Sequence, residues 1–92
     1  MNYIKEEIRG IQHRIAEINE EIGMLEYDRD MSEDYLWQSE KEDEILKEKN
    51  HLEETKRRLD QFRLIRTVYG NLLDNLEYRY YHLDCFQEQP NQ

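Results

Sequence analysis

The stretch IKEEIRGIQHRIAEINEEIGML, residues 4–25, decides the fold class. Its isoleucine and leucine residues follow one another at alternating spacings of four and three positions, and most positions between them are charged or amide side chains. This is the heptad pattern of a coiled-coil helix, and the strict alternation of a β-strand is absent. The pattern predicts a helix over about residues 3–27, whose packing seam consists of Ile4, Ile8, Ile11, Ile15, Ile18, Ile22 and Leu25.

The composition favours long helices that share a core. The chain has 92 residues, of which 37% are hydrophobic and 38% are charged, so a compact core within one chain would be small. Three Gly and one Pro are too few for a turn-rich β fold. We therefore expect a single all-α domain of coiled-coil type over residues 1–88, followed by a disordered tail at residues 89–92.

A second helix is predicted over about residues 33–86. Residues 28–31 resemble a short connection, and Ser32 followed by Glu33 and Asp34 resembles a helix N-cap with an acidic first turn. A connection this short makes the second helix an antiparallel neighbour of the first, so the fold expected is a helical hairpin. The seam of the second helix starts with residues seven positions apart, which are Ile45, Leu52 and Leu59.

The second helix is predicted to be much longer than the first. Its heptad phase continues through Gly70, although Gly70-Asn71 would also suit a break within a three-helix bundle. A first helix of about 35 Å cannot cover such a partner, and the apolar stripe widens beyond Phe62. We therefore expect a homodimer that forms a helical bundle. The residues predicted for the interface with a second copy or another partner are Phe62, Ile65, Tyr69, Leu72, Leu73, Leu76, Tyr78, Tyr80, Tyr81, Leu83 and Phe86.

The net charge of −9 is distributed in blocks, because residues 28–44 are strongly acidic and residues 45–66 are basic. Unlike blocks meet when such rods pair in antiparallel or staggered fashion. The basic stretch, residues 56–66, could contact phosphates through Lys56, Arg57, Arg58, Arg63 and Arg66. The negative charge of the whole chain opposes this, so nucleic acid is not the expected partner.

Two pairs of carboxylates, Glu17-x-x-Glu20 and Glu40-x-x-Asp43, resemble the ExxE…ExxD pattern of the all-α nucleoside triphosphate pyrophosphohydrolases. The resemblance implies Mg²⁺ held by carboxylates of facing helices. In the heptad register, however, all four side chains fall at outer positions, where they cannot converge inside a hairpin. We therefore expect a solvated acidic face and no enzyme, with such a hydrolase as the alternative.

Two further motifs contain metal-ligand residue types. Glu48-x-x-His51 resembles half of a di-iron helix-bundle site, and His82-x-x-Cys85 places two zinc-type ligands one helical turn apart. Each would need a second copy of the motif to complete a site. The sequence therefore predicts no metal and no cofactor.

The expected function is that of a non-enzymatic protein–protein interaction module, an adaptor or an inhibitor that regulates an unidentified partner protein by docking on it or occluding it. An alternative is that the acidic face imitates nucleic acid, as in phage-encoded anti-defence proteins. A single Cys and the absence of a signal pattern or of an apolar run of about 20 residues predict a cytoplasmic protein without a membrane span.

Overall fold

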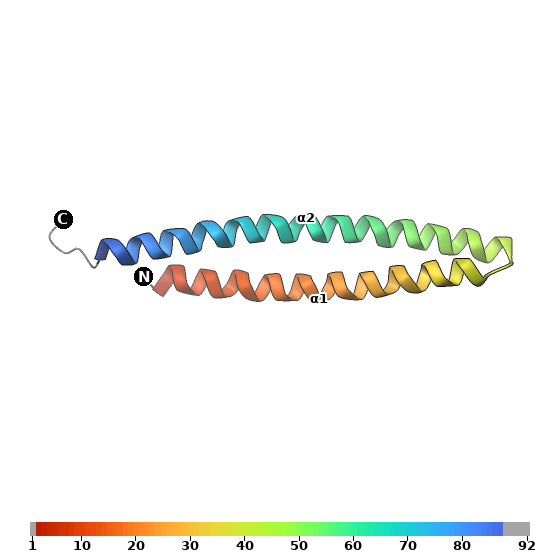
Figure 1. Ribbon diagram of the computed structural model, residues 1–92, viewed down its shortest axis with the longest axis horizontal. Helices are drawn as coiled ribbons and strands as arrows, with labels where there is room; N and C mark the ends of the chain where they lie inside the picture. Colours follow the sequence, from red (N-terminus) through yellow and green to blue (C-terminus); the bar gives the residue numbers. More distant parts are fainter. Residues whose placement is uncertain (1, 88–92) are drawn as a thin grey trace.

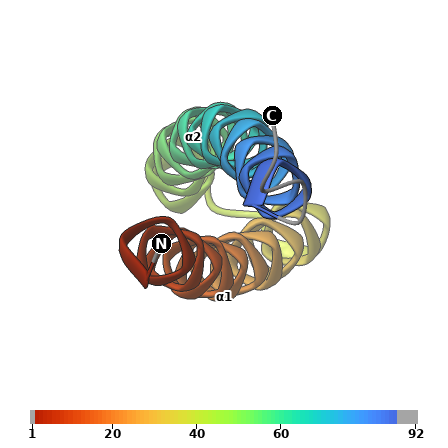
Figure 2. The same ribbon diagram turned by 90° about the vertical axis from the view of Figure 1, so that its left-hand side faces the viewer.

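The computed structural model describes residues 2–87, with side chains for residues 3–82. This part of the chain forms two helices, α1 (Asn2–Gln38) and α2 (Glu42–Gln87). They lie side by side in opposite directions, in a rod of 76 × 16 × 14 Å (Figure 1). Seen along the rod, both helices wind around a common axis (Figure 2), as in a coiled coil. The prediction of an all-α antiparallel hairpin is confirmed.

The connection between the helices lies at residues 39–41, and the predicted connection at residues 28–31 is wrong. The heptad phase of α1 continues past Leu25 through Arg29, Ser32 and Leu36. Ser32 is only 3% exposed, so it occupies the seam and does not cap a new helix. Because no Gly or Pro interrupts residues 24–38, nothing in the backbone requires the helix to stop at Tyr27.

The connection falls within a wholly polar run, residues 38–44, where the seam offers no apolar side chain to bury. The amide of Ser39 still bonds to the Tyr35 carbonyl at 2.9 Å, and the Ile45 amide bonds to the Lys41 carbonyl at 3.0 Å. Three acidic residues, Glu42, Asp43 and Glu44, form the first turn of α2. Their negative charges favour a helix start because they oppose the dipole of the peptide groups.

Helix α2 runs without a break through Gly70, so the three-helix alternative is wrong. Gly70 does not have a positive φ, which a C-cap glycine at the end of a helix commonly adopts. Seam residues on either side of it carry the helix through, because Phe62 and Tyr69 pack against the core cluster and Leu73 and Leu76 are partly buried.

The core is a narrow strip between the two helices. Its buried apolar residues are Ile18, Ile22 and Leu25 from α1 and Leu52 and Leu59 from α2. The other residues of the predicted packing seam are partly buried, and these are Ile4, Ile8, Ile11, Ile15 and Ile45. The hairpin therefore depends on a few well-covered side chains near its middle.

Helix α1 covers far more of α2 than the sequence suggested. At 1.5 Å per residue, α1 is about 55 Å long and α2 about 69 Å. The predicted short first helix is therefore wrong, and a second copy is not needed to cover the whole C-terminal half of α2. Several residues predicted for an intermolecular interface instead lie in the seam of the hairpin. Phe62 and Tyr69 pack against the core cluster, and Leu73, Leu76 and Tyr80 are partly buried.

The seam contains a polar segment between the connection and the apolar core. Ser32 Oγ donates to Glu48 Oε1 at 2.6 Å, and His51 Nε2 is hydrogen-bonded to Asp28 Oδ2 at 2.9 Å. Thr55, which is 3% exposed, has its hydroxyl 2.9 Å from the His51 carbonyl and 3.4 Å from Asp28. Polar groups in a seam are tolerated when each has a partner. This network supplies those partners across the hairpin and joins the two helices where apolar side chains are missing.

Ser32→Ala is expected to lower the free energy of unfolding by about 1–2 kcal/mol, because the Glu48 carboxylate loses a hydrogen bond in a half-buried place. Urea unfolding of Ser32→Ala, Glu48→Ala and the double variant measures the coupling between the two side chains. A coupling free energy of zero would show that the bond contributes nothing to stability.

Candidate protein-interaction surface

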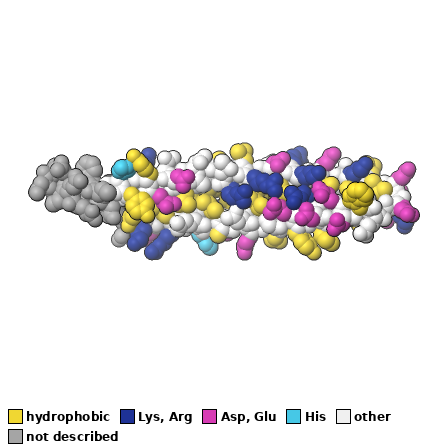
Figure 3. All heavy atoms as spheres, in the orientation of Figure 1, with side chains coloured by type: hydrophobic (Ala, Val, Ile, Leu, Met, Phe, Trp, Pro, Cys, Tyr) yellow, Lys and Arg dark blue, Asp and Glu magenta, His cyan; other side chains and the backbone are white. Residues whose placement is uncertain are grey.

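One face of the hairpin is bridged by charged and polar pairs between the helices. Lys56 Nζ lies 3.7 Å from Glu33 Oε1, and Arg63 Nη2 lies 3.2 Å from Glu26 Oε2. Further along, Arg66 Nη1 donates to Asn19 Oδ1 at 3.1 Å. Figure 3 shows basic and acidic side chains mixed over the half of the rod nearer to the connection. We call this the ion-paired face, and it satisfies much of its own charge.

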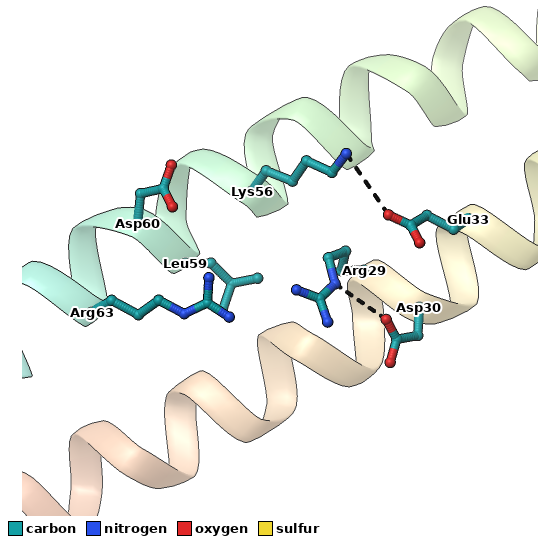
Figure 4. Close-up of a pocket in the computed structure, with 7 residues that line it drawn as sticks. All are labelled: Arg29, Asp30, Glu33, Lys56, Leu59, Asp60 and Arg63. Atoms are coloured by element: carbon teal, nitrogen blue, oxygen red, sulfur yellow. Dashed lines mark hydrogen bonds and ion pairs between the residues drawn. The ribbon is translucent and has the colours of Figure 1, made fainter.

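The ion-paired face contains an open hollow of about 350 Å³, shown in Figure 4. Leu59 lies between the helices, and charged side chains of both signs surround it. Arg29 Nε donates to Asp30 Oδ1 at 3.1 Å on one side of the hollow, and Lys56 reaches Glu33 on the other. The hollow is lined by Arg29, Asp30, Glu33, Lys56, Leu59, Asp60 and Arg63. Because acids and bases alternate around it, the hollow has no strong preference for a ligand of one charge.

A row of exposed apolar side chains lies on the other side of the seam of α2. Ile65, Val68 and Leu72 are spaced by three and four residues, and are 41%, 58% and 44% exposed. Nine residues, or two and a half helical turns, separate Lys56 from Ile65, so the row lies roughly opposite the ion-paired face. We call this row the Val68 face. Leu64, 65% exposed, borders it.

Both helices contribute to the side of the hairpin that carries the Val68 face. The hydrogen bonds between Asp28 and His51 and between Tyr35 and Glu44 lie on this side. Glu44 and His51 occupy the same heptad position as Ile65 and Leu72 further along α2. On α1, two exposed methionines seven residues apart belong to the same side, and these are Met24 and Met31.

Four of the residues predicted for an interface are available to a partner. Ile65, Leu72, Tyr78 and Tyr81 are exposed. The side chains of Leu83 and Phe86 lie outside the described residues, as do that of Cys85 and residues 89–92. Leu64, Val68 and the two methionines were not assigned to the interface. Val68 could have been found from its spacing to Ile65 and Leu72, which places the three side chains on one side of a helix. The two methionines could have been found because they are seven residues apart.

The carboxylates of the hydrolase-like pattern do not come together. Glu17, Glu20, Glu40 and Asp43 are all exposed, as the heptad register predicted. Glu17 pairs along its own helix, with His13 at 3.4 Å and Arg14 at 3.8 Å. In the part of the chain that the structure describes, no three His, Cys, Asp or Glu side chains are grouped so that they could hold a metal ion.

The basic stretch is largely engaged with acids of the same chain. Besides the pairs of Lys56 and Arg63, the Arg57 guanidinium pairs with Glu54 one turn earlier. Glu48 and His51, which resembled half of a di-iron site, are bonded to Ser32 and Asp28. Apart from the pair of Arg57 with Glu54, which lies within α2, these contacts join the two helices.

The hydroxyl of Tyr35 donates to Glu44 Oε2 at 2.9 Å beside the connection. This hydrogen bond to a carboxylate, together with partial desolvation, raises the pKa of Tyr35 above its ordinary value of 10.0. Since the folded-state pKa is the higher one, the bond stabilises the hairpin below pH 10 and the stabilisation is lost as the pH rises through the folded-state pKa.

We expect the pKa of Tyr35 to lie above 10.0 in the native chain and to be lower in Glu44→Ala than in the native chain. A titration of the tyrosine Cζ signals by NMR, with Tyr35→Phe used for assignment, measures both values. Ionisation of Tyr35 below pH 10.0 in the native chain would contradict the hydrogen bond.

Comparisons with protein-family models, with curated proteins and with solved structures gave no match for this chain. Over the residues that the structure describes, neither helix is apolar enough along a sufficient length to cross a membrane. The function is therefore argued from the surfaces of the hairpin themselves.

Proposed function

We propose that this chain is a non-enzymatic protein–protein interaction module, a helical hairpin that forms a homodimer and docks on a partner protein as an adaptor or inhibitor. The observation that carries the proposal is the run of exposed apolar and aromatic side chains along the second half of α2. Exposed apolar side chains gathered on one part of a surface are a mark of interaction sites in proteins. The run consists of Leu64, Ile65, Val68, Leu72, Tyr78 and Tyr81.

The exposed area of the chain supports self-association. The hairpin exposes 7688 Å², whereas a compact protein of 11.5 kDa exposes about 5,800 Å². Two chains that each buried the difference, roughly 1,900 Å², would form an interface in the size range of obligate homodimers. A second copy is thus the simplest way for this rod to reach the burial of an ordinary globular protein.

Tyr78 and Tyr81 support the docking of a further protein. Each is 65% exposed near the far end of α2 from the connection. Tyrosine is enriched at protein interfaces because its ring buries a large area at little cost in side-chain entropy, while its hydroxyl can form a hydrogen bond. A protein partner also fits the charges better than nucleic acid, since Lys56, Arg57 and Arg63 already pair with carboxylates.

The docking proposal is tested by affinity capture from an extract of the native host with the full chain as bait. The variant Tyr78→Ala/Tyr81→Ala is compared with Tyr3→Ala/Tyr27→Ala, which removes two tyrosines of α1 that are each 69% exposed. We expect the native chain and the α1 variant to capture a protein in stoichiometric amount, and the α2 variant to lose it. Equal capture by both variants, or no stoichiometric protein at all, would contradict the proposal.

A further inference from the structure

We propose that two copies of this chain pack face to face through the Val68 face, with their α2 helices antiparallel and a two-fold axis passing beside Val68. This inference rests on the proposed self-association and adds its geometry. The product is a four-helix bundle in which each Ile65 meets the partner's Leu72, and each Val68 meets the partner's Val68.

The Val68 face has the symmetry that such a contact needs. A two-fold interface brings the same surface patch together from both copies, so the patch must complement itself. Ile65 and Leu72 flank Val68 at three and four residues, and the exposed amides Gln61 and Asn75 lie seven residues away on either side. An antiparallel contact therefore pairs apolar with apolar side chains and amide with amide side chains.

Charged residues further along the same row favour the antiparallel arrangement over the parallel one. Glu54 and His82 each lie fourteen residues from Val68, and Arg79 lies one turn before His82. In an antiparallel pair, Glu54 comes beside the partner's His82. The single unfavourable contact along this row is that of Arg58 with the partner's Arg79. In a parallel pair, Glu54 would face Glu54 and Arg79 would face Arg79, and such like-charge contacts are unfavourable.

Helix α1 carries a balanced pair of charges at the same level of the rod. Because Asn19 bonds to Arg66, the segment of α1 that contains Arg14 and Glu17 lies beside the segment of α2 that contains Val68. Both side chains are exposed, at 59% and 50%, and they pair with each other at 3.8 Å. Because this pair is neutral, the two-fold axis can bring its two copies together without adding net charge beside the apolar centre.

The ion-paired face does not compete for the second copy. Its inter-helix pairs, Glu33 with Lys56 and Glu26 with Arg63, are satisfied within one chain and remain solvated when the opposite face is covered. Along α2, the row from Glu54 to His82 is about 42 Å long. A contact of this length between two hairpins buries far more area than three apolar side chains alone.

Disulfide trapping of the full chain tests the geometry. All variants carry Cys85→Ser so that the native thiol does not contribute, and light scattering first establishes that the Cys85→Ser chain is a dimer. A disulfide requires the two Cα atoms to lie within about 7 Å. On mild oxidation, Val68→Cys is expected to form a disulfide-linked dimer. Ile65→Cys and Leu72→Cys are expected to cross-link as a mixture at least 10-fold more than either alone. Lys56→Cys, on the ion-paired face, is the control that stays monomeric on a non-reducing gel.

Three results would overturn the inference. Self-linking of Ile65→Cys and of Leu72→Cys without linking of their mixture would show a parallel dimer. Linking of Lys56→Cys without linking of Val68→Cys would place the contact on the other face. Both of these leave the proposed self-association intact, whereas a monomeric mass for the Cys85→Ser chain would remove the dimer itself.

Substitution of a charge gives an independent readout. Val68→Asp places two carboxylates beside the axis and is expected to raise the dimer dissociation constant at least 100-fold. Leu46→Asp, at a side chain that is 62% exposed on the far side of α2, is expected to leave the constant within about threefold. Circular dichroism verifies that both variants stay helical. Equal effects of the two substitutions would contradict the assigned face.

Discussion

Leu59→Ala is expected to lower the free energy of unfolding by about 3–4 kcal/mol, the largest effect of any alanine substitution among residues 3–82. Leu59 is 1% exposed, less than any other side chain among residues 3–82, and it belongs to the same core cluster as Ile18, Ile22 and Leu25. Removing its three terminal carbons loses the free energy of their transfer from water and leaves a cavity that two long, regular helices cannot easily close. A rod with so few buried apolar side chains has little else to compensate.

The measurement is urea unfolding followed by circular dichroism, at one fixed chain concentration because association adds to apparent stability. Leu64→Ala is the matched control, since Leu64 has the same size, lies on the same helix and is 65% exposed. Its effect on a single hairpin is expected to stay within about 0.5 kcal/mol. Equal losses for the two variants would mean that the seam does not run through Leu59.

Gly23→Ala combined with Gly70→Ala is expected to raise the free energy of unfolding by about 2 kcal/mol. Both glycines lie inside helices, and a Cβ added to either would meet nothing within 4 Å. Alanine restricts the unfolded chain more than glycine does, which is worth about 1 kcal/mol at each helical position. Gly10 is not included because it lies on the same side of α1 as Met24, where the proposed dimer would cover it.

The same variants test whether α2 is continuous. In an unbroken helix each substitution stabilises, and the two effects add because the sites lie on different helices. If a helix ended at Gly70 with a positive φ, alanine there would instead destabilise by about 1 kcal/mol. Thermal unfolding monitored by circular dichroism separates the two cases. A lower melting temperature for Gly70→Ala alone would contradict the continuous helix.

The sequence predicted the seam well because its apolar residues keep one phase over many heptads. Ile18, Ile22 and Leu59 needed only their spacing to be placed in a core. The position of the connection was not predictable in this way, because the seam changes from apolar to polar at Arg29 and Ser32. A buried serine is acceptable only if it has a partner, and that partner, Glu48, lies on the other helix. The resemblance of Ser32 to an N-cap therefore led to the wrong helix end, because α1 continues for about three turns beyond Tyr27.

The candidate interface was predicted only in part for a related reason. Exposure depends on how far α1 reaches along α2, which follows from the position of the connection. With a short α1, Tyr69 and Leu73 were assigned to a partner, but the longer α1 covers them. Ile65 and Leu72 remained exposed because they lie to one side of the seam, whatever the length of α1. Their symmetric spacing around Val68 is visible in the sequence. That this side of the hairpin is free for a second copy follows only from the structure, in which the opposite side is covered with ion pairs within one chain.

Multi-angle light scattering of the full chain at micromolar concentration shows whether this hairpin completes its burial by pairing with a second copy. We expect a mass of about 23 kDa, twice the 11.5 kDa of one chain, and a return to a single-chain mass in Val68→Asp. A mass of 11.5 kDa for the native chain across the concentration range would contradict it.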